Sequence, residues 1–440
     1  MATELTTTEM GTEVEEKAAA KALAIFRLLL ADYHPRDFDV AFWDGTRWPA
    51  ENGSPRFSLV VHNAAALRRI FTRRPNDLAL SEGFISGDLD VEGDLEAAMP
   101  VGNYLMNRAW PASTVLRVGV NLLGMRRANR IRQKSRPSAE LAGELHSVER
   151  DREAIKFHYD VSNEFYALWL DERMVYSCAY FDTIDESLEA AQTRKLDYIC
   201  RKLRLRPGER LLDIGCGWGG LVIHAARQYG VQALGITVSE NQAKLANEGI
   251  VRSGLQPDCR VEVLDYRNLD GSDRFDKIVS VGMFEHVGER LLPLYFQRAW
   301  RLLRPGGVFL NHGIANRSID PRPKVPNFIS KYVFPDGELV PINVTLRHAE
   351  DAGFEVRDVE SLREHYTRTL RHWSERLELR RADALRVVDK SVYRVWRLFL
   401  NGSAHAFSAG LLNLYQALLL KPIDGQSRLP LTRADWYRDG

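Results

Sequence analysis

The 440-residue sequence predicts an α/β protein with a doubly wound, mostly parallel sheet and a smaller α+β domain before it. From about residue 151, segments patterned as strands alternate with segments patterned as helices, which is typical of a parallel sheet covered by helices. A glycine-rich turn at residues 215–220 follows one of these strands. Because ligands of such sheets lie beyond the carboxyl ends of the strands, this turn marks the expected site.

The first hundred residues show the mixed pattern of the smaller domain. Residues 1–16 are rich in Thr and Glu, lack the pattern of a signal peptide, and are expected to form a disordered leader. The elements predicted after the leader are a helix at 16–31, strands at 38–43 and 57–62, a helix at 63–72, and loops with short strands at 80–95. Asn63 is the expected N-cap of the second helix.

The alternation after residue 151 supplies the elements of the larger domain. Strands are predicted at 211–214, 231–236, 261–264, 276–281 and 308–312, helices at 220–229, 240–253 and 291–302, and a strongly helical tail at 371–420. The domain plan is a leader at 1–16, an N-terminal domain at 17–135, a linker at 136–149 and a catalytic domain at 150–440.

Composition removes several classes of protein. The net charge is +1, so no overall field attracts nucleic acid. The four cysteines have neither the spacing of a zinc site nor that of a disulfide framework, and no metal site is expected. No apolar run reaches the ~18 residues of a membrane-spanning helix. We therefore expect a cytoplasmic protein.

One segment departs from this balanced charge. Residues 101–139 contain eight Lys or Arg and no Asp or Glu, with apolar residues between them. Three interpretations stay open: a solvated helix face with a charged linker, a basic amphipathic segment attracted to an anionic membrane, or a nucleic-acid contact. The scarcity of aromatic residues weakens the third.

The glycine turn carries the main chemical signal. Gly215, Gly217 and Gly220 satisfy G-x-G-x-x-G, which alone is compatible with a dinucleotide. Asp213, however, stands two residues before the first glycine, and no acidic residue closes the next strand at 235–238, where a nicotinamide cofactor's ribose is bound. These two features argue against a dinucleotide.

D-I-G-C-G-W-G at 213–219 resembles motif I of the class I S-adenosylmethionine-dependent methyltransferases, and 275–287 and 302–312 resemble their fourth and fifth strand motifs. This resemblance implies the class I methyltransferase fold, with a seven-stranded sheet.

More specific strings resemble the cyclopropane fatty acid synthase family, which includes the mycolic acid methyltransferases; they are FHYDVSNEFYALWLD (157–171), YSCAYF (176–181), ITVSENQ (236–242), LDYR (264–267), GMFEHVG (282–288), HGIA (312–315) and HYTRTL (365–370). The resemblance covers roughly residues 150–420, and the N-terminal part resembles, more weakly, the extra domain of the longer bacterial synthases.

The resemblance implies that a cis double bond of a phospholipid acyl chain attacks the methyl group of S-adenosylmethionine. The resulting carbocation loses a proton to bound bicarbonate and closes to a cyclopropane. The implied cofactor contacts are Tyr176, Ser177, Asp213, Gly215, Gly217, Thr237, Val238, Gln242, Tyr266 and Gly282. The implied bicarbonate pocket consists of Cys178, Glu285, His312, Ile314 and Tyr366.

Taken singly, each pocket residue has an ordinary structural role, such as a small core thiol or a core histidine, and only the ordered set indicates catalysis. Asn311 departs from the family, which often has an aliphatic residue there, and suggests a more polar strand end.

Two other functions stay open. One is a methyl- or methylene-branching fatty acyl methyltransferase of the same fold, and the other is a lipid-binding or regulatory protein with a relic methyltransferase domain. The expected partner is an anionic phospholipid bilayer, contacted by the N-terminal domain at the inner face of the membrane. No nucleic-acid partner is expected, and a homodimer is the candidate assembly.

Overall fold

The computed structural model describes residues 2–72, 75–123, 125, 141–159, 161–317 and 327–437. The chain forms two compact units. Unit 1 contains residues 1–138, 325–332 and 389–405, and unit 2 contains 139–324, 333–388 and 406–440. Two late segments of the chain thus belong to the same unit as the N-terminal residues, an arrangement that a division along the sequence does not provide.

Unit 1 is built on a four-stranded sheet with the order β2-β1-β3-β4, in which β1 and β3 are parallel. Its strands are β1 (Phe38–Phe42), β2 (Arg47–Trp48), β3 (Phe57–Val61) and β4 (Leu89–Gly93). Its helices are α1 (Ala2–Leu29), α2 (Ala64–Phe71), α3 (Asp77–Ile85), α4 (Leu95–Asn107), α5 (Ala112–Leu123), α12 (Phe328–Tyr332) and most of α16 (Lys390–Ser408). Aromatic side chains such as Phe26 and Phe38 fill its core.

A buried arginine explains why α16 belongs to unit 1. The guanidinium of Arg394 donates to the carbonyls of Phe84 and Leu89, at 2.5 and 2.8 Å, and to the Asp90 carboxylate at 2.7 Å. These bonds satisfy carbonyls at the end of α3 and the start of β4, which lie about three hundred residues earlier in the chain.

Most predictions for the N-terminal region are confirmed, and two are wrong. The strands at 38–43 and 57–62 are present, and Asn63 caps α2 by accepting from the amide of Ala66 at 2.9 Å. Residues 80–95 contain part of helix α3 as well as β4, because Asn76 caps a helix that runs through the glycine at position 83. The leader predicted to be disordered is helical from Ala2, since extending an existing helix costs less than nucleating one.

Unit 2 has a seven-stranded sheet with the order β10-β11-β9-β8-β5-β6-β7. Strands β7, β6, β5, β8 and β9 are parallel neighbours, and β11 is antiparallel to both β9 and β10. The strands are β5 (Arg210–Ile214), β6 (Gln232–Thr237), β7 (Cys259–Val263), β8 (Phe275–Val281), β9 (Leu303–Asn316), β10 (Glu355–Ser361) and β11 (Leu412–Leu420). The doubly wound, mostly parallel fold predicted from the sequence is confirmed.

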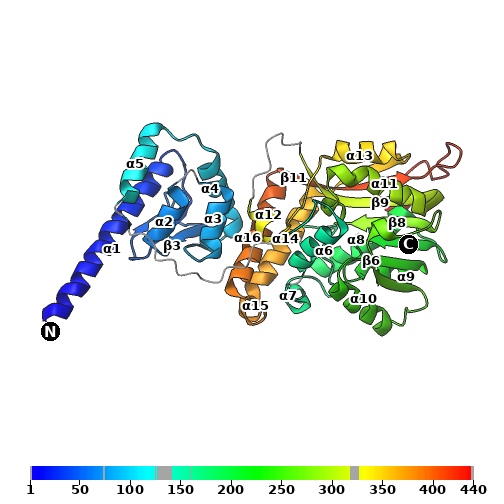
Figure 1. Cartoon of the computed structure of the whole chain (residues 1–440), viewed down its shortest axis with the longest axis horizontal. Coiled ribbons are helices and arrows are strands. Elements are labelled where there is room, and N and C mark those ends of the chain that lie inside the picture. The colour runs from blue at the N-terminus through cyan, green and yellow to red at the C-terminus, as the bar shows by residue number, and fades with distance from the viewer. Residues whose placement is uncertain are drawn as a thin grey trace. The chain divides into compact units, whose positions relative to one another are not determined.

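Helices cover both faces of this sheet (Figure 1). Alternate residues of the central strands enter two separate cores: Leu211 packs with α8, α9 and α10, whereas Leu212 packs on the opposite face with α11 and α13. The helices of unit 2 are α6 (Val148–Tyr159), α7 (Asn163–Ala167), α8 (Leu188–Leu203), α9 (Gly220–Tyr229), α10 (Glu240–Arg252), α11 (Leu292–Leu302), α13 (Ile342–Asp351), α14 (Arg363–Leu379) and α15 (Arg381–Val387). The short 3₁₀ turns are η1 (Tyr266–Asn268), η2 (Phe284–His286), η3 (Glu289–Leu291) and η4 (Ala434–Trp436).

The prediction of a helical tail at 371–420 is correct for α14, α15 and α16 and wrong at its end. Leu412–Leu420 forms β11, which lies inside the sheet between β9 and β10. A strand covered on both faces has a continuous apolar sequence, which periodicity cannot distinguish from a buried helix. Within the described residues, no helix combines the length and apolar character that crossing a membrane requires.

Candidate active site

The glycine turn bends the chain sharply at the carboxyl end of β5. Gly215 and Gly217 have φ of 79° and 54°, a left-handed conformation that favours glycine. The amides of Gly215 and Cys216 both donate to the carbonyl of Ile236, at 2.9 and 3.0 Å. A Cβ atom at Gly215 would lie 2.7 Å from Met283, whereas one at Gly217 would meet nothing within 4 Å. The turn is therefore tied to β6, and its middle faces open space.

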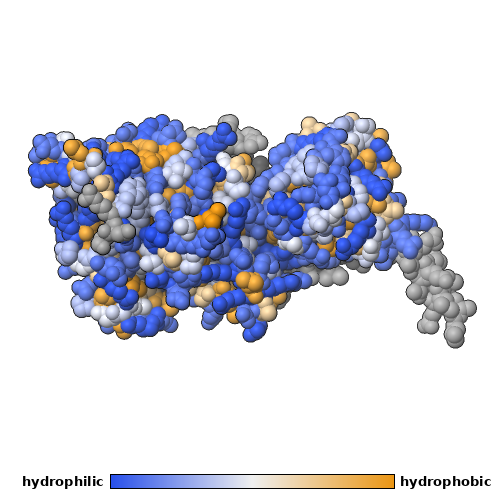
Figure 2. Space-filling view, turned by 180° about the vertical axis from the view of Figure 1, so that it is seen from behind, coloured by the Kyte–Doolittle hydropathy of each residue, from blue (hydrophilic) through white to orange (hydrophobic). Residues whose placement is uncertain are grey.

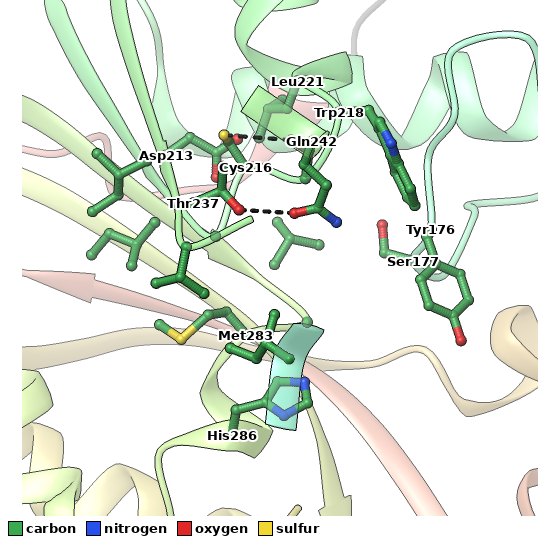
Figure 3. A pocket seen from close by; sticks show the side chains of 18 of the residues that line it. Tyr176, Ser177, Asp213, Cys216, Trp218, Leu221, Thr237, Gln242, Met283 and His286 are labelled. Atoms are coloured by element: carbon green, nitrogen blue, oxygen red, sulfur yellow. Dashed lines mark hydrogen bonds between the residues drawn. The ribbon is translucent and has the colours of Figure 1, made fainter. Parts of the chain in front are cut away.

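A cavity lies at this end of β5, β6 and β8 (Figure 3). All ten residues that the sequence resemblance implies for the cofactor line it, from Tyr176 and Ser177 to Tyr266 and Gly282. The structure therefore brings together residues that are spread over about a hundred positions of the chain. Their contact with a cofactor stays a prediction.

Two ionisable side chains from different elements line the same cavity, an aspartate on β5 and a lysine on α8. Asp213 on β5 is 2% exposed, and its Oδ1 has no hydrogen-bond partner among the described residues. Burial raises the pKa of Asp213 to about 7, against the effect of the Lys195 ammonium. Lys195 on α8 is 1% exposed, and burial lowers its pKa to about 8. The nearby Asp171, Cys178 and Asp213 act in the opposite direction and raise this pKa. Its Nζ donates to Ser177 Oγ at 2.8 Å.

Thr237 at the end of β6 and Gln242 on α10 form a hydrogen-bonded pair. They stand at the strand end where dinucleotide-binding folds have an acidic residue that binds the ribose. The Thr237 hydroxyl donates to Gln242 Oε1 at 2.8 Å, and the Ser239 amide donates to Thr237 Oγ1 at 3.2 Å. With its oxygen engaged, the Gln242 amide presents its N–H groups to the cavity, as Figure 3 shows. The pair therefore suits a hydroxyl oxygen as its ligand.

The predicted bicarbonate residues lie around the ends of β8, β9 and α14. Glu285 in η2 accepts from the Ile314 amide at 2.7 Å, and its Oε2 has no partner within the described chain. Burial raises the pKa of Glu285 to about 7, against the effect of this bond. His312 is 1% exposed, and burial lowers its pKa well below its usual range. A neutral imidazole is the result.

The tautomer of His312 follows from its neighbour on β11. Its Nδ1 lies 3.1 Å from Gln416 Nε2. Because an amide nitrogen only donates, this orientation places the ring proton on Nε2, which has no hydrogen-bond partner in the part of the chain that the structure describes. His312 is thus set to donate from Nε2.

Cys178 and Tyr366, the other two residues predicted for the bicarbonate pocket, both contact the backbone carbonyl of Leu362. Leu362 O lies 3.8 Å from Cys178 Sγ and accepts from the Tyr366 amide at 3.0 Å. The Leu362 amide donates to Leu414 O at 2.8 Å, and Leu414 pairs in register with Ile314. Burial raises the pKa of the Cys178 thiol far above its usual range, so the thiol is neutral. All five residues therefore lie on adjoining elements, with direct contact shown between Glu285 and Ile314.

Asn311 makes the end of β9 more polar, as expected. It is 3% exposed, and its Oδ1 accepts from the Tyr295 hydroxyl at 2.9 Å. The departure from an aliphatic residue is therefore matched by a buried hydrogen bond.

The sequence reasoning missed the residues that hold the segment 176–179. Gln192 Nε2 donates to the carbonyl of Ser177 at 2.9 Å, and Thr369 Oγ1 accepts from the amide of Ala179 at 3.0 Å. Gln192 and Lys195 lie on the buried face of α8. Polar residues at apolar positions of an amphipathic helix were the signal that marked them.

Comparisons with known proteins show which family the chain resembles. Residues 146–417 match the family model described as mycolic acid cyclopropane synthetase. The chain is 42% identical over 400 residues to a probable fatty acid methyltransferase of Pseudomonas putida, covering 90% of this chain and 95% of the relative. It is 35% identical to the cyclopropane-fatty-acyl-phospholipid synthase of Escherichia coli K12, covering 76% and 86%.

A solved structure is similar to part of the chain. The mycolic acid cyclopropane synthase CmaA1, complexed with SAH and CTAB, is 35% identical with a TM-score of 0.58, covering 61% of this chain and 98% of that one. The family model and the relatives together identify the chain as a member of the cyclopropane fatty acid synthase and fatty acid methyltransferase family of S-adenosylmethionine-dependent enzymes.

Proposed function

We propose that this enzyme converts the cis double bond of an unsaturated phospholipid acyl chain into a cyclopropane ring. S-adenosylmethionine supplies an electrophilic methyl group. The alkene takes this methyl, and the carbocation that forms on the acyl chain loses one methyl proton to bicarbonate, so that the net change is the addition of CH₂. The observation that carries the proposal is the buried pair Glu285 and His312, each of which has one polar atom without a hydrogen-bond partner in the described residues.

The cavity fits the cofactor. Gly217 faces open space where a side chain would collide with a ligand, and the Asp213 carboxylate keeps one buried oxygen without a partner among the described residues. The Gln242 amide suits a ribose hydroxyl, and Asp213 suits the ammonium group of the cofactor's amino-acid end.

The second set of residues suits a small anion rather than a protein base. A carbocation reacts with a nearby thiolate or carboxylate, so a Cys178 thiol and a protonated Glu285 protect it, while the Nδ1 lone pair of His312 is engaged by the Gln416 amide. His312 Nε2–H and a protonated Glu285 are both hydrogen-bond donors, and each has an atom without a partner in the described residues. Two such donors can hold the oxygens of bicarbonate, which then accepts the proton.

A second function has one observation in its favour. The Pseudomonas putida relative is called a probable fatty acid methyltransferase. If a 1,2-hydride shift moves the positive charge to the carbon that bears the new methyl group, loss of a methyl proton leaves a methylene branch instead of a ring. A saturated methyl branch would additionally need a hydride donor.

Lipid analysis decides between these products. Lipids from cells that express the chain are compared by mass spectrometry, before and after ozonolysis, with lipids from cells that express an inactive variant. A product that is heavier by CH₂ and resists ozonolysis supports the cyclopropane, and cleavage at the added carbon supports the methylene branch. An unchanged lipid profile together with intact cofactor binding would instead indicate a relic methyltransferase domain.

Bicarbonate use has its own test. Turnover of the purified enzyme should fall when dissolved bicarbonate is removed and recover when it is restored. A rate that does not depend on bicarbonate would refute this part of the proposal and leave the product assignment intact.

The membrane partner is also a proposal, supported by helix α5. Its face toward solvent carries Val115, Leu116, Val120 and Leu123, which are 58%, 69%, 59% and 76% exposed, while Val118 and Leu122 pack into the core of unit 1. Figure 2 shows hydrophobic side chains on the surface of this unit. An apolar helix face of this kind suits the interface of a lipid layer.

Most of the basic residues in the segment 101–139 follow this helix in the sequence. Residues 126–136 lie outside the described residues, whereas Arg108 donates to Tyr104 and pairs with Asp32 within unit 1. Lys and Arg near an anionic surface contribute about 1 kcal/mol each, so four of them would add about 4 kcal/mol. We therefore propose reversible docking on the inner face of an anionic membrane.

Vesicle binding tests this partner. Binding to vesicles containing anionic phospholipid should weaken in high salt and when Arg126, Arg127, Arg130 and Arg132 become Gln. Leu116→Asn with Leu123→Asn should weaken it further, whereas Leu379→Asn in unit 2, at a residue 79% exposed, serves as the matched control. Equal binding by all variants would refute the proposal.

A further inference from the structure

Lys195 in unit 2 carries a buried ammonium that the reaction chemistry above does not use. It comes from the buried face of α8, lines the cofactor cavity and donates to Ser177 Oγ at 2.8 Å. A buried ammonium is costly unless it meets anions or hydrogen-bond acceptors. Asp171, Cys178 and Asp213 are its electrostatic neighbours, and Asp213 lines the same cavity.

The bond to Lys195 fixes the direction of the Ser177 hydroxyl. An ammonium has three hydrogens and no lone pair, so the serine oxygen must accept, and its own hydrogen then points away from Lys195. In Figure 3 the Ser177 oxygen faces the interior of the cavity. The hydroxyl is therefore a donor toward the cavity, made stronger by the positive charge behind it.

We propose that Lys195 and Ser177 together bind the carboxylate of the amino-acid end of S-adenosylmethionine, with Lys195 acting as a positioning residue through the serine hydroxyl. The cofactor's sulfonium and ammonium are positive and would be repelled by Lys195, which leaves the carboxylate as the matching group. Asp213, from the β5 side of the cavity, matches the cofactor's ammonium. The inference rests on the cofactor of the family and not on the proposed lipid product.

Calorimetric titration with two ligands tests this assignment. The ligands are S-adenosylmethionine and its decarboxylated form, which keeps the sulfonium and the amino group. Lys195→Met should weaken binding of the first about 10- to 100-fold, the range expected for a hydrogen bond to a charged group, and change the second less than about threefold. A merely structural role would weaken both ligands equally, and that result, or no loss at all, overturns the proposal.

Lys202 offers the matched control. It lies on the same helix, is fully buried, and pairs with Asp358 and Glu360 rather than with the cavity. Lys202→Met should leave the ratio of the two affinities unchanged, and the thermal unfolding of each variant shows that it is folded.

If Lys195→Met does not fold, Ser177→Ala provides the same test. It should produce the same selective loss for the ligand with the carboxylate. In the double variant the two losses should not add, because both side chains act through one hydroxyl. Fully additive losses would show that Lys195 does not act through Ser177 and would overturn the pairing.

Discussion

Replacing Glu285 by Gln should make folding more stable at alkaline pH and leave stability at acidic pH nearly unchanged. The Glu285 carboxyl is buried, accepts one hydrogen bond from the Ile314 amide, and has a second oxygen without a partner within the described residues. Glutamine keeps the accepting oxygen and the size of the side chain, so it mimics the protonated acid at every pH.

The magnitude follows from the raised pKa. Unfolded Glu285 ionises near 4.5, whereas folded Glu285 holds its proton until about pH 7. At 1.36 kcal/mol per pKa unit, the wild type loses about 3 kcal/mol of stability from this group as pH rises through that interval. The sign is that of a carboxyl whose pKa is raised: the stability is present below the unfolded pKa and is lost as pH rises to the folded one.

Urea unfolding followed by tryptophan fluorescence measures the effect. The free energy of unfolding of Glu285→Gln minus that of the wild type should grow by about 2–3 kcal/mol between about pH 5 and about pH 8. Glu248→Gln, whose side chain is 48% exposed, controls for the loss of a carboxylate elsewhere. A difference that stays constant over this range would show that Glu285 is ionised throughout and would refute both the pKa argument and its role as a neutral donor.

Three further outcomes can be measured. Gly217→Val should abolish cofactor binding in calorimetry, whereas Gly254→Val, with a similar φ of 67° and open surroundings, should not; equal affinities would contradict the glycine cradle. Tyr295→Phe should lower the free energy of unfolding by about 1–3 kcal/mol, because it leaves buried Asn311 without its donor. Tyr366→Phe should reduce turnover about 10²–10⁴-fold at unchanged cofactor affinity, and full activity would remove it from the base pocket.

The cofactor cavity was predictable because its signals are local. A glycine turn requires particular residues within a few positions, and its place at the end of a strand fixes which edge of the sheet it occupies. The ten implied residues meet at one cavity since they lie at or just after the ends of β5, β6, β7 and β8 or precede α8.

Sequence patterns did not predict the features that depend on residues far away in the chain. β11 is a strand only because β9 and β10 pair with it, and its leucine-rich sequence is equally compatible with a helix. α16 joins unit 1 through Arg394 and carbonyls from the beginning of the chain. Lys195 is polar at a position where the helix pattern predicts an apolar residue, and only the structure shows the Ser177 hydroxyl that it meets.

The short segment around residues 177 and 178 links the two halves of the proposed reaction. Ser177 contacts Lys195 beside the cofactor cavity, and Cys178 contacts the Leu362 carbonyl beside Tyr366. Gln192 fixes the carbonyl of Ser177, and Thr369 fixes the amide of Ala179, so both ends of the segment are held by buried side chains. A carbocation survives only if its base is already beside the methyl donor, since any delay admits water. One segment with both ends anchored therefore joins the cofactor cavity to Cys178 of the proposed bicarbonate pocket, which is the closeness that the proposed reaction requires.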